Sequence, residues 1–356
     1  MAHFQIAFFN HKGGVSKTTS VFNLGWMLAE KGKTVLLVDC DPQCNLTGLV
    51  LDYGNELTYK FESKDEVLNI RDALAPAFEA RPTGLEAPTL QKVKDRQGLY
   101  VLPGHVGFAE YESQLAISHN LSSAIPALQN IPGSIRWMLN LAAEKVQADY
   151  VLVDMSPSLG SINQNLWASS DAFVVPMAPD YFSAMALRSL STVLPRWHSW
   201  SLQAAKDTGL ANSAYPWRPM SPKYLGSVVQ NYRTRIRDGK PAAPTKAYQT
   251  WFDELKKAKS ASLIPALSSS GLLLSNEVYL EGKSPVTDFL IEVPDFNSLV
   301  ASSQEHSKPV FKLTSDDLKS SGVVALTQEQ SVDKFKQIYG SGADKIIEMM
   351  SSVSSQ

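Results

Sequence analysis

The stretch that most constrains this chain is residues 10–19, which read N-H-K-G-G-V-S-K-T-T. The apolar run at residues 4–9, directly before it, is typical of a buried strand. After it, residues 20–31 place their apolar side chains at the spacing of one helical face. A glycine-rich turn between a strand and a helix is the local structure that a phosphate-binding loop requires, because backbone N–H groups and the helix N-terminus then face the anion.

The loop departs from the usual phosphate-loop pattern, G-x-x-x-x-G-K-[S/T], at both glycine positions, which His11 and Ser16 occupy. The closing lysine and hydroxyl are in place as Lys17 and Thr18. We expect Lys17 to reach the β- and γ-phosphates of a nucleotide and Thr18 to ligate Mg²⁺. Backbone N–H groups would surround the phosphates. The predicted nucleotide-binding residues of the loop are Gly13, Gly14, Val15, Ser16, Lys17, Thr18 and Thr19.

Two further apolar runs end in aspartates. Residues 34–38 precede Asp39 and Asp41, and residues 150–153 precede Asp154. In an open α/β sheet, carboxylates at the carboxyl ends of strands point into the ligand crevice. The residue types alone also suit a strand-ending turn after residue 38, because Asp-Pro is a common turn sequence. The strands and the intervening helical segments predict an α/β fold.

The run K-G-G-V-S-K-T-T resembles the deviant Walker A loop, K-G-G-x-G-K-T-T, of the ParA/MinD family of ATPases, and the resemblance covers nearly the whole chain. It implies a P-loop NTPase-like, three-layer α/β/α fold with a mostly parallel central sheet. Lys12 matches the lysine that crosses a dimer interface to the phosphates of the partner's ATP. Ser16 stands where the family has glycine, so a side chain lies where the backbone approaches phosphate closely.

Two later motifs carry the same resemblance. The sequence D-C-D-P-Q-C-N from residue 39 is similar to the family's second phosphate-site motif. This implies that Asp41 orients the attacking water and that Asp39 lies in the magnesium shell. The sequence D-M-S-P-S-L-G from Asp154 is similar to the Walker B strand and its following loop, which implies that Asp154 holds Mg²⁺. The predicted catalytic residues are Lys12, Lys17 and Asp41, and the predicted metal site is Thr18, Asp39 and Asp154.

A basic segment at residues 233–259 carries eight basic and three acidic side chains in a chain of net charge −2. Such a segment suits a solvated surface or the phosphate backbone of a nucleic acid. Because ParA/Soj proteins bind DNA without sequence preference near this position, the resemblance implies that Arg233, Arg235 and Arg237 contact DNA. Asn231 ends another strand, and it is either a turn former or, by resemblance, a contact to adenine.

The 356 residues, 44% of them hydrophobic, are ample for a large core. We expect one ParA-like domain over residues 1–356, with insertions near 50–98, 200–222 and 262–284 and a disordered tail at 351–356. Cys40 and Cys44, the two cysteines, are expected to be buried or half-buried thiols. The chain begins directly with a strand, and no apolar stretch reaches the roughly 18 residues of a membrane span. We therefore expect a cytoplasmic, nucleoid-associated protein without membrane attachment.

The resemblance thus implies an ATPase that uses ATP and Mg²⁺, forms a homodimer with ATP and binds DNA non-specifically. It would segregate a plasmid or chromosome with a ParB-like activator protein that stimulates slow hydrolysis. Two alternatives remain open: a MinD-like positioning ATPase, or a slow nucleotide switch without a DNA role. A MinD-like protein should end in a basic amphipathic helix, whereas residues 338–350 carry Lys345 as their only base.

Overall fold

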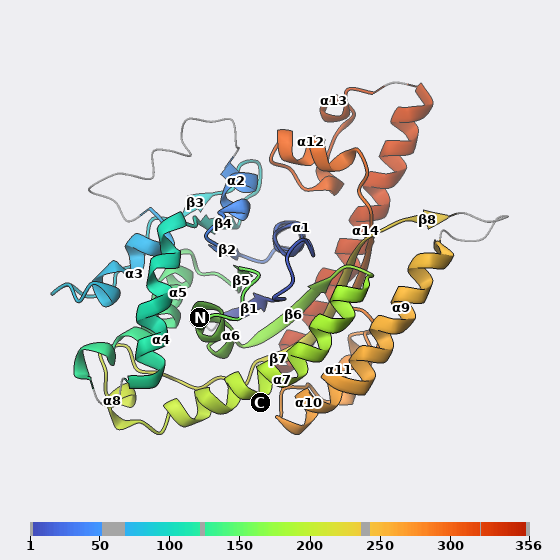
Figure 1. Ribbon diagram of the computed structural model, residues 1–356. Helices are drawn as coiled ribbons and strands as arrows, with labels where there is room; N and C mark the ends of the chain where they lie inside the picture. The colour runs from blue at the N-terminus through green and yellow to red at the C-terminus, as the bar shows by residue number, and fades with distance from the viewer. Residues whose placement is uncertain (1–2, 52–67, 122–124, 236–242, 321, 354–356) are drawn as a thin grey trace.

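The structure is a computed structural model that describes residues 3–51, 68–121, 125–235, 243–320 and 322–353. Among these residues, eight strands form one sheet in the order β10-β7-β6-β1-β5-β2-β4-β3 (Figure 1). Neighbouring strands pair in parallel, except that β3 pairs antiparallel with β4 at one edge. The strands are β1 (Phe4–Phe8), β2 (Val35–Cys40), β3 (Gln91–Lys92), β4 (Leu99–Leu102), β5 (Tyr150–Met155), β6 (Ala172–Met177), β7 (Lys223–Tyr232) and β10 (Ile291–Pro294).

The central strands are buried on both faces, which is why they read as continuous apolar runs in the sequence. Strand β1 lies in the middle and pairs with β5 on one side and β6 on the other. The predicted α/β fold with a mostly parallel central sheet is confirmed. The strands predicted at residues 4–9, 34–38 and 150–153 are also confirmed, with small differences at their ends.

Helices cover both faces of the sheet, and each face has its own core. Because successive side chains of β1 point to opposite faces, Ile6 and Phe8 belong to one core and Ala7 to the other. The first core includes side chains from α1 (Lys17–Glu30), α2 (Asn45–Leu51), α11 (Asn276–Glu281), α12 (Leu299–Glu305) and α14 (Gly322–Val353). The second includes side chains from α3 (Ile70–Phe78), α4 (Tyr111–Leu121), α5 (Ile131–Val146), α6 (Ser161–Ala168), α7 (Tyr181–Ala204), α9 (Lys246–Ala258) and α10 (Ile264–Ser269).

The end of the chain differs from the sequence-based expectation. The tail predicted to be disordered at residues 351–356 is wrong for residues 351–353, which continue α14. They do so because α14 packs along the sheet, with Met349 and Met350 fully buried near its end. The last three residues of that tail lie outside the described residues, as do residues 52–67 of the first predicted insertion.

The predicted insertions contain regular structure. Helix α3 and strand β3 lie within residues 50–98, and β4, which directly follows this segment, joins the central sheet beside β2. Helix α8 (Thr208–Ala211) lies within residues 200–222, and α10 and α11 lie within residues 262–284. That these segments are insertions into a shorter family fold stays a prediction.

A small hairpin projects from the carboxyl end of β7. Strands β8 (Thr234–Arg235) and β9 (Ala243–Pro244) pair antiparallel, and β8 extends away from the central sheet at the right of Figure 1. The chain then enters α9. Arg237 lies between the two strands, outside the described residues. Among the helices that the structure describes, none combines the length and apolar character needed to span a bilayer.

Candidate functional site

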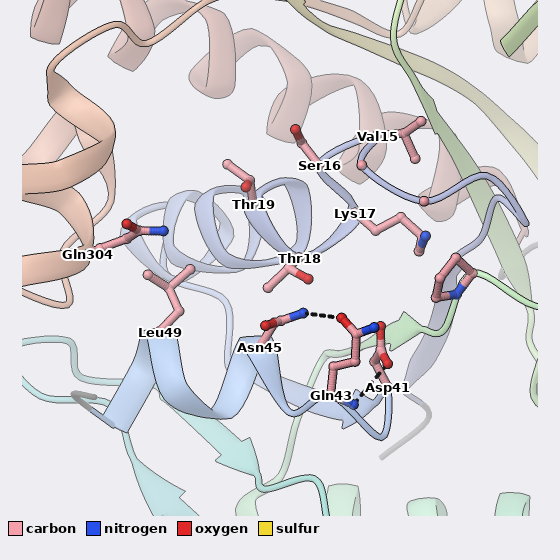
Figure 2. A pocket seen from close by; sticks show the side chains of 13 residues that line it. Val15, Ser16, Lys17, Thr18, Thr19, Asp41, Gln43, Asn45, Leu49 and Gln304 are labelled. Carbon is pink, nitrogen blue, oxygen red and sulfur yellow. Dashed lines mark hydrogen bonds between the residues drawn. The ribbon is translucent and has the colours of Figure 1, made fainter. Parts of the chain in front are cut away.

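The site lies at the point in the sheet where the order of the strands reverses. From β1 the chain passes to β2 on one side of the sheet, whereas β6 and β7 lie on the other side. The crevice outside the carboxyl ends of the strands at such a point is the usual ligand position in an open α/β sheet. A pocket of about 430 Å³ lies there, lined by residues 13–19, by Asp41, Gln43, Asn45 and Leu49 after β2, by Pro157 after β5 and by Gln304 of α12 (Figure 2).

The loop between β1 and α1 turns through two left-handed residues. Gly14 has φ of 71° and Ser16, the N-cap residue of α1, has φ of 56°. The end of β7 holds this turn, because Nδ2 of Asn231 donates to Oγ of Ser16 at 2.9 Å and Nε2 of Gln230 donates to the Ser16 carbonyl at 3.2 Å. Ser16 therefore adopts the backbone conformation that favours glycine, the residue at this position in the deviant Walker A pattern.

Lys17 is buried at the start of α1, and its ammonium group faces the loop. Its Nζ donates to the carbonyl oxygens of Asn10 at 3.1 Å and Lys12 at 3.3 Å. Burial lowers the pKa of Lys17, and the nearby carboxylates of Asp154 and Asp41 act in the opposite direction. A phosphate in this loop would offer the ammonium group a fully charged partner in place of two carbonyl dipoles.

Lys12 points to a different partner. Its Nζ forms an ion pair with Oδ2 of Asp180 at 2.6 Å. Asp180 is the N-cap residue of α7, and its Oδ1 accepts a hydrogen bond from the backbone N–H of Ser183 at 2.8 Å. Burial works to raise the pKa of Asp180, but the hydrogen bonds from Lys12 and Ser183 outweigh it and lower this pKa. Lys12 thus belongs to the loop, but its ammonium group is paired with the N-cap residue of α7.

Asp154, which the sequence predicts to be the Walker B aspartate, contacts the hydroxyl of Thr18 in the loop. Oγ1 of Thr18 donates to Oδ2 of Asp154 at 2.7 Å, whereas Oδ1 of Asp154 is buried and has no hydrogen-bond partner in the described part of the chain. Burial raises the pKa of Asp154 well above its usual range, and the charge of Asp39 adds to this effect. A divalent cation beside Thr18 fits this arrangement, because it would give the second carboxylate oxygen a partner and offset the repulsion between carboxylates.

Within the described part of the chain, side chains alone do not complete such a cation site. The described residues contain no group of three or more His, Cys, Asp or Glu side chains that could hold a metal ion. Phosphate oxygens and water would therefore have to supply the remaining ligands, which is the usual coordination of Mg²⁺ at a nucleotide.

Asp41 and Asp39 take different positions. Asp41 lines the pocket, and its Oδ1 accepts a hydrogen bond from the backbone N–H of Gln43 at 3.1 Å. Oδ2 of Asp39 accepts from the N–H and the hydroxyl of Thr47 at 2.8 and 2.6 Å, and burial raises the pKa of Asp39 to about 6. Asp39 is absent from the described residues that line the pocket, so its place in the magnesium shell stays a prediction.

The two cysteines beside these aspartates are unreactive by position. Cys40 is buried in β2 and Cys44 is half-buried in the following turn, and both thiols are free, as predicted. Burial raises the pKa of both thiols, that of Cys44 to about 12. Neither is therefore a thiolate near neutral pH.

Five residues line the pocket without having been predicted as site residues, and one of them, Pro157, lies within the D-M-S-P-S-L-G motif. Gln43 and Asn45 lie within the D-C-D-P-Q-C-N motif, which could have indicated them, and Leu49 follows on α2. Gln304 comes from α12, late in the chain, and no motif indicates it. Asn231 does not line the pocket, among the described residues, and its contact to adenine stays a prediction.

Comparison with known sequences identifies relatives of this chain. A family model described as an AAA domain matches residues 4–201. The sporulation initiation inhibitor protein Soj of Bacillus subtilis is 32% identical over 190 residues, which cover 53% of this chain and 62% of that protein. The chromosome-partitioning ATPase Soj of Treponema pallidum is 31% identical over 235 residues, which cover 65% of this chain and 79% of that protein. With the first two curated relatives, the match spans 60% and 62% of their length.

Solved structures share the fold. Protein DIP2308 from Corynebacterium diphtheriae is 24% identical with a TM-score of 0.58, and the match covers 85% of this chain and 97% of that one. The structure of the pNOB8 ParA protein bound to nonspecific DNA is 16% identical with a TM-score of 0.53, and the match covers 99% of both chains.

Proposed function

Because the chain belongs to the ParA/MinD family of ATPases, we propose that it binds ATP with Mg²⁺, dimerises with ATP bound, and segregates a plasmid or chromosome. The contact of Thr18 with Asp154 beside the buried ammonium group of Lys17 carries this proposal. It brings a hydroxyl, a carboxylate and a lysine together at the end of a phosphate-binding loop. A ParB-like partner would stimulate slow hydrolysis of the bound ATP to ADP and phosphate.

In this mechanism the loop residues bind the phosphates, and Lys17 exchanges two carbonyl partners for phosphate oxygens. Mg²⁺, when bound, would neutralise part of the charge on the phosphates. Thr18 and Asp154 would hold this ion. Asp41 lines the pocket from the β2 side, where its carboxylate would orient the attacking water and accept its proton.

The surface around the loop supports dimerisation. Tyr181 and Phe182, which begin α7 directly after Asp180, are large exposed side chains, and Phe182 is 67% exposed. Leu159 and Met185 are also exposed apolar residues. Tyr181, Phe182 and Met185 thus expose apolar groups at the start of α7, next to the Asp180 partner of Lys12, and such a face is typical of an interaction surface. We propose that a second copy of the chain covers this face and that Lys12 leaves its ion pair to reach the partner's ATP.

The hairpin beyond β7 supports DNA binding. Arg233 and Arg235 are exposed, and β8 extends away from the central sheet. The next helix, α9, adds Lys246, Lys256 and Lys257. Such residues would contact the phosphate backbone and would not read bases. The pNOB8 ParA protein, which shares this fold, was solved with nonspecific DNA. Association with the nucleoid would follow from this contact.

The MinD-like alternative is disfavoured by α14. A membrane-binding helix must leave its apolar face free for lipid. In α14 this face is used by the core, because five of its apolar side chains are fully buried: Tyr339, Ala343, Ile346, Met349 and Met350.

The direct test is the molar mass in solution, measured by light scattering without nucleotide, with ADP and with ATP. We expect ATP alone to produce a dimer of the wild-type chain and to leave the Lys12→Ala variant monomeric. The matched control is Lys94→Ala, which removes an exposed lysine outside the pocket lining and should dimerise normally. A wild-type mass that ATP does not change would refute the proposal. Dimerisation without phosphate release would favour the slow nucleotide switch.

A further inference from the structure

The pocket extends well beyond the phosphate loop. Lys17 lies at one end of it in Figure 2, and Leu49 and Gln304 lie at the opposite end. These two residues come from α2 and α12, two elements that are remote in sequence. A pocket of about 430 Å³ is within the range of sites that enclose whole small molecules, so it has room for more than a phosphate chain.

The far end of the pocket offers chemistry that phosphates do not use. Leu49 provides a nearly buried apolar surface, and Gln304 provides an exposed side-chain amide. The amide of Gln304 makes no hydrogen bond within the described part of the chain, so it can donate and accept in full. An apolar wall beside a group that both donates and accepts is suited to a nucleoside, which combines a flat apolar face with polar edges and hydroxyls.

The turn after Gln304 is fixed against the rest of the pocket. The N–H of Val310 donates to Oδ1 of Asn23 on α1 at 3.3 Å, and Oγ of Ser303 donates to the carbonyl of Lys308 at 2.6 Å. Lys308 in turn contacts both carboxylate oxygens of Asp317 at 2.9 Å. The turn that follows α12 is therefore anchored on α1, the helix that begins at the phosphate loop, and Ser303 ties α12 to this turn.

Asn231, the amide residue that the sequence predicts to contact adenine, is already engaged. Its Nδ2 donates to Oγ of Ser16, and the residue is absent from the described lining of the pocket. We infer that Gln304 contacts the nucleoside part of the bound nucleotide and, with Leu49, makes the site prefer a nucleotide to a bare polyphosphate. This inference rests on the proposed nucleotide binding and adds the residue that recognises the nucleoside.

The test compares two ligands that share the phosphates and differ in the nucleoside. Binding of ATP and of inorganic tripolyphosphate, both with Mg²⁺, is measured by calorimetry for the wild type, Gln304→Leu and Val300→Ala. Val300 is an exposed residue of the same helix and serves as the control. We expect Gln304→Leu to weaken ATP binding about tenfold, the effect of one hydrogen bond, and to leave tripolyphosphate binding unchanged.

Unchanged ATP affinity in Gln304→Leu would overturn the inference, and so would an equal loss for both ligands, which would mean that the residue acts through the loop. A wild-type chain that binds neither ligand would instead refute the nucleotide site itself. GTP and 2′-deoxy-ATP then locate the contact. If Gln304→Leu no longer prefers ATP to GTP, the amide contacts the base. If it no longer prefers ATP to 2′-deoxy-ATP, the amide contacts the ribose. Retention of both preferences would exclude direct contact.

Discussion

Ser16 holds a backbone conformation that is costly for a residue with a side chain. Its φ of 56° and ψ of 38° are left-handed, and Asn231 donates a hydrogen bond to its hydroxyl. The left-handed conformation costs an L-residue roughly 1–2 kcal/mol relative to glycine. The serine at this position therefore preserves the shape of the loop at the expense of some stability.

We predict that Ser16→Gly raises the free energy of unfolding by about 1 kcal/mol, because it removes this backbone strain. Urea denaturation measures the change. The reverse kind of substitution, Gly14→Ala, should lower the free energy of unfolding by a similar amount, because Gly14 has φ of 71°. An added Cβ would meet no atom of the described residues within 4 Å, so backbone strain alone would cause the change. A Ser16→Gly variant no more stable than the wild type would contradict the prediction.

At this scale the sequence located the loop, Asp41 and Asp154 because each lies within a contiguous motif at a strand end. Contacts that join distant segments could not be found in this way. The ion pair of Lys12 with Asp180 spans 168 positions, and only the parallel order of β1 and β6 brings its two ends together. The position of Gln304 depends on the turn after α12, where Val310 donates to Asn23 of α1, and no local pattern encodes this contact.

Among the elements, α6 begins with a cap supplied by another helix. Its N-cap residue, Gly160, has no side chain to cap it, and Glu112 of α4 takes this role. The carboxylate of Glu112 accepts hydrogen bonds from the backbone N–H groups of Ser161 and Ile162, the latter at 3.1 Å. Because α6 directly follows the loop that contains Pro157, this cap also fixes one wall of the pocket.

We predict that Glu112→Ala lowers the free energy of unfolding by about 1–2 kcal/mol, because two N–H groups and the positive end of the α6 dipole lose their anionic partner. The matched control is Glu110→Ala, which breaks an exposed ion pair with Arg71 and should cost less than about 1 kcal/mol. Chemical denaturation of both variants provides the comparison. Equal losses in the two variants would show that the cap adds nothing beyond surface charge.

The elements themselves were largely predictable. The central strands are uninterrupted apolar runs and the helix after the loop has a clear apolar face, so their positions follow from periodicity. The cap of α6 was not predictable, because Glu112 lies 49 positions before Ser161 and nothing in the sequence around Gly160 indicates a partner.

For the molecule as a whole, the two proposed binding regions lie at the same ends of the parallel strands. The phosphate loop and the β8–β9 hairpin both follow the carboxyl ends of strands. Arg218, in contrast, precedes the amino end of β7. Nucleotide and DNA would therefore approach the same side of the protein. This arrangement would allow nucleotide binding and DNA binding to affect each other over a short distance.

We predict that the double variant Arg233→Ala/Arg235→Ala weakens binding to all DNA sequences alike and reduces the slope of log affinity against log salt by about 2, one for each lost phosphate contact. The measurement is a DNA titration with the ATP-bound protein at several salt concentrations. The control is Arg218→Ala, which removes an exposed arginine before the amino end of β7 and should leave the slope unchanged. The prediction fails if both variants change the slope equally.

The pocket joins the beginning of the chain to a helix near its end. During synthesis the phosphate loop leaves the ribosome before the hairpin with Arg233 and Arg235, and α12 follows the hairpin. Only after α12 has emerged can Gln304 take its place in the lining. A chain that ends before α12 would therefore carry Arg233 and Arg235 without the complete lining of its ligand cavity.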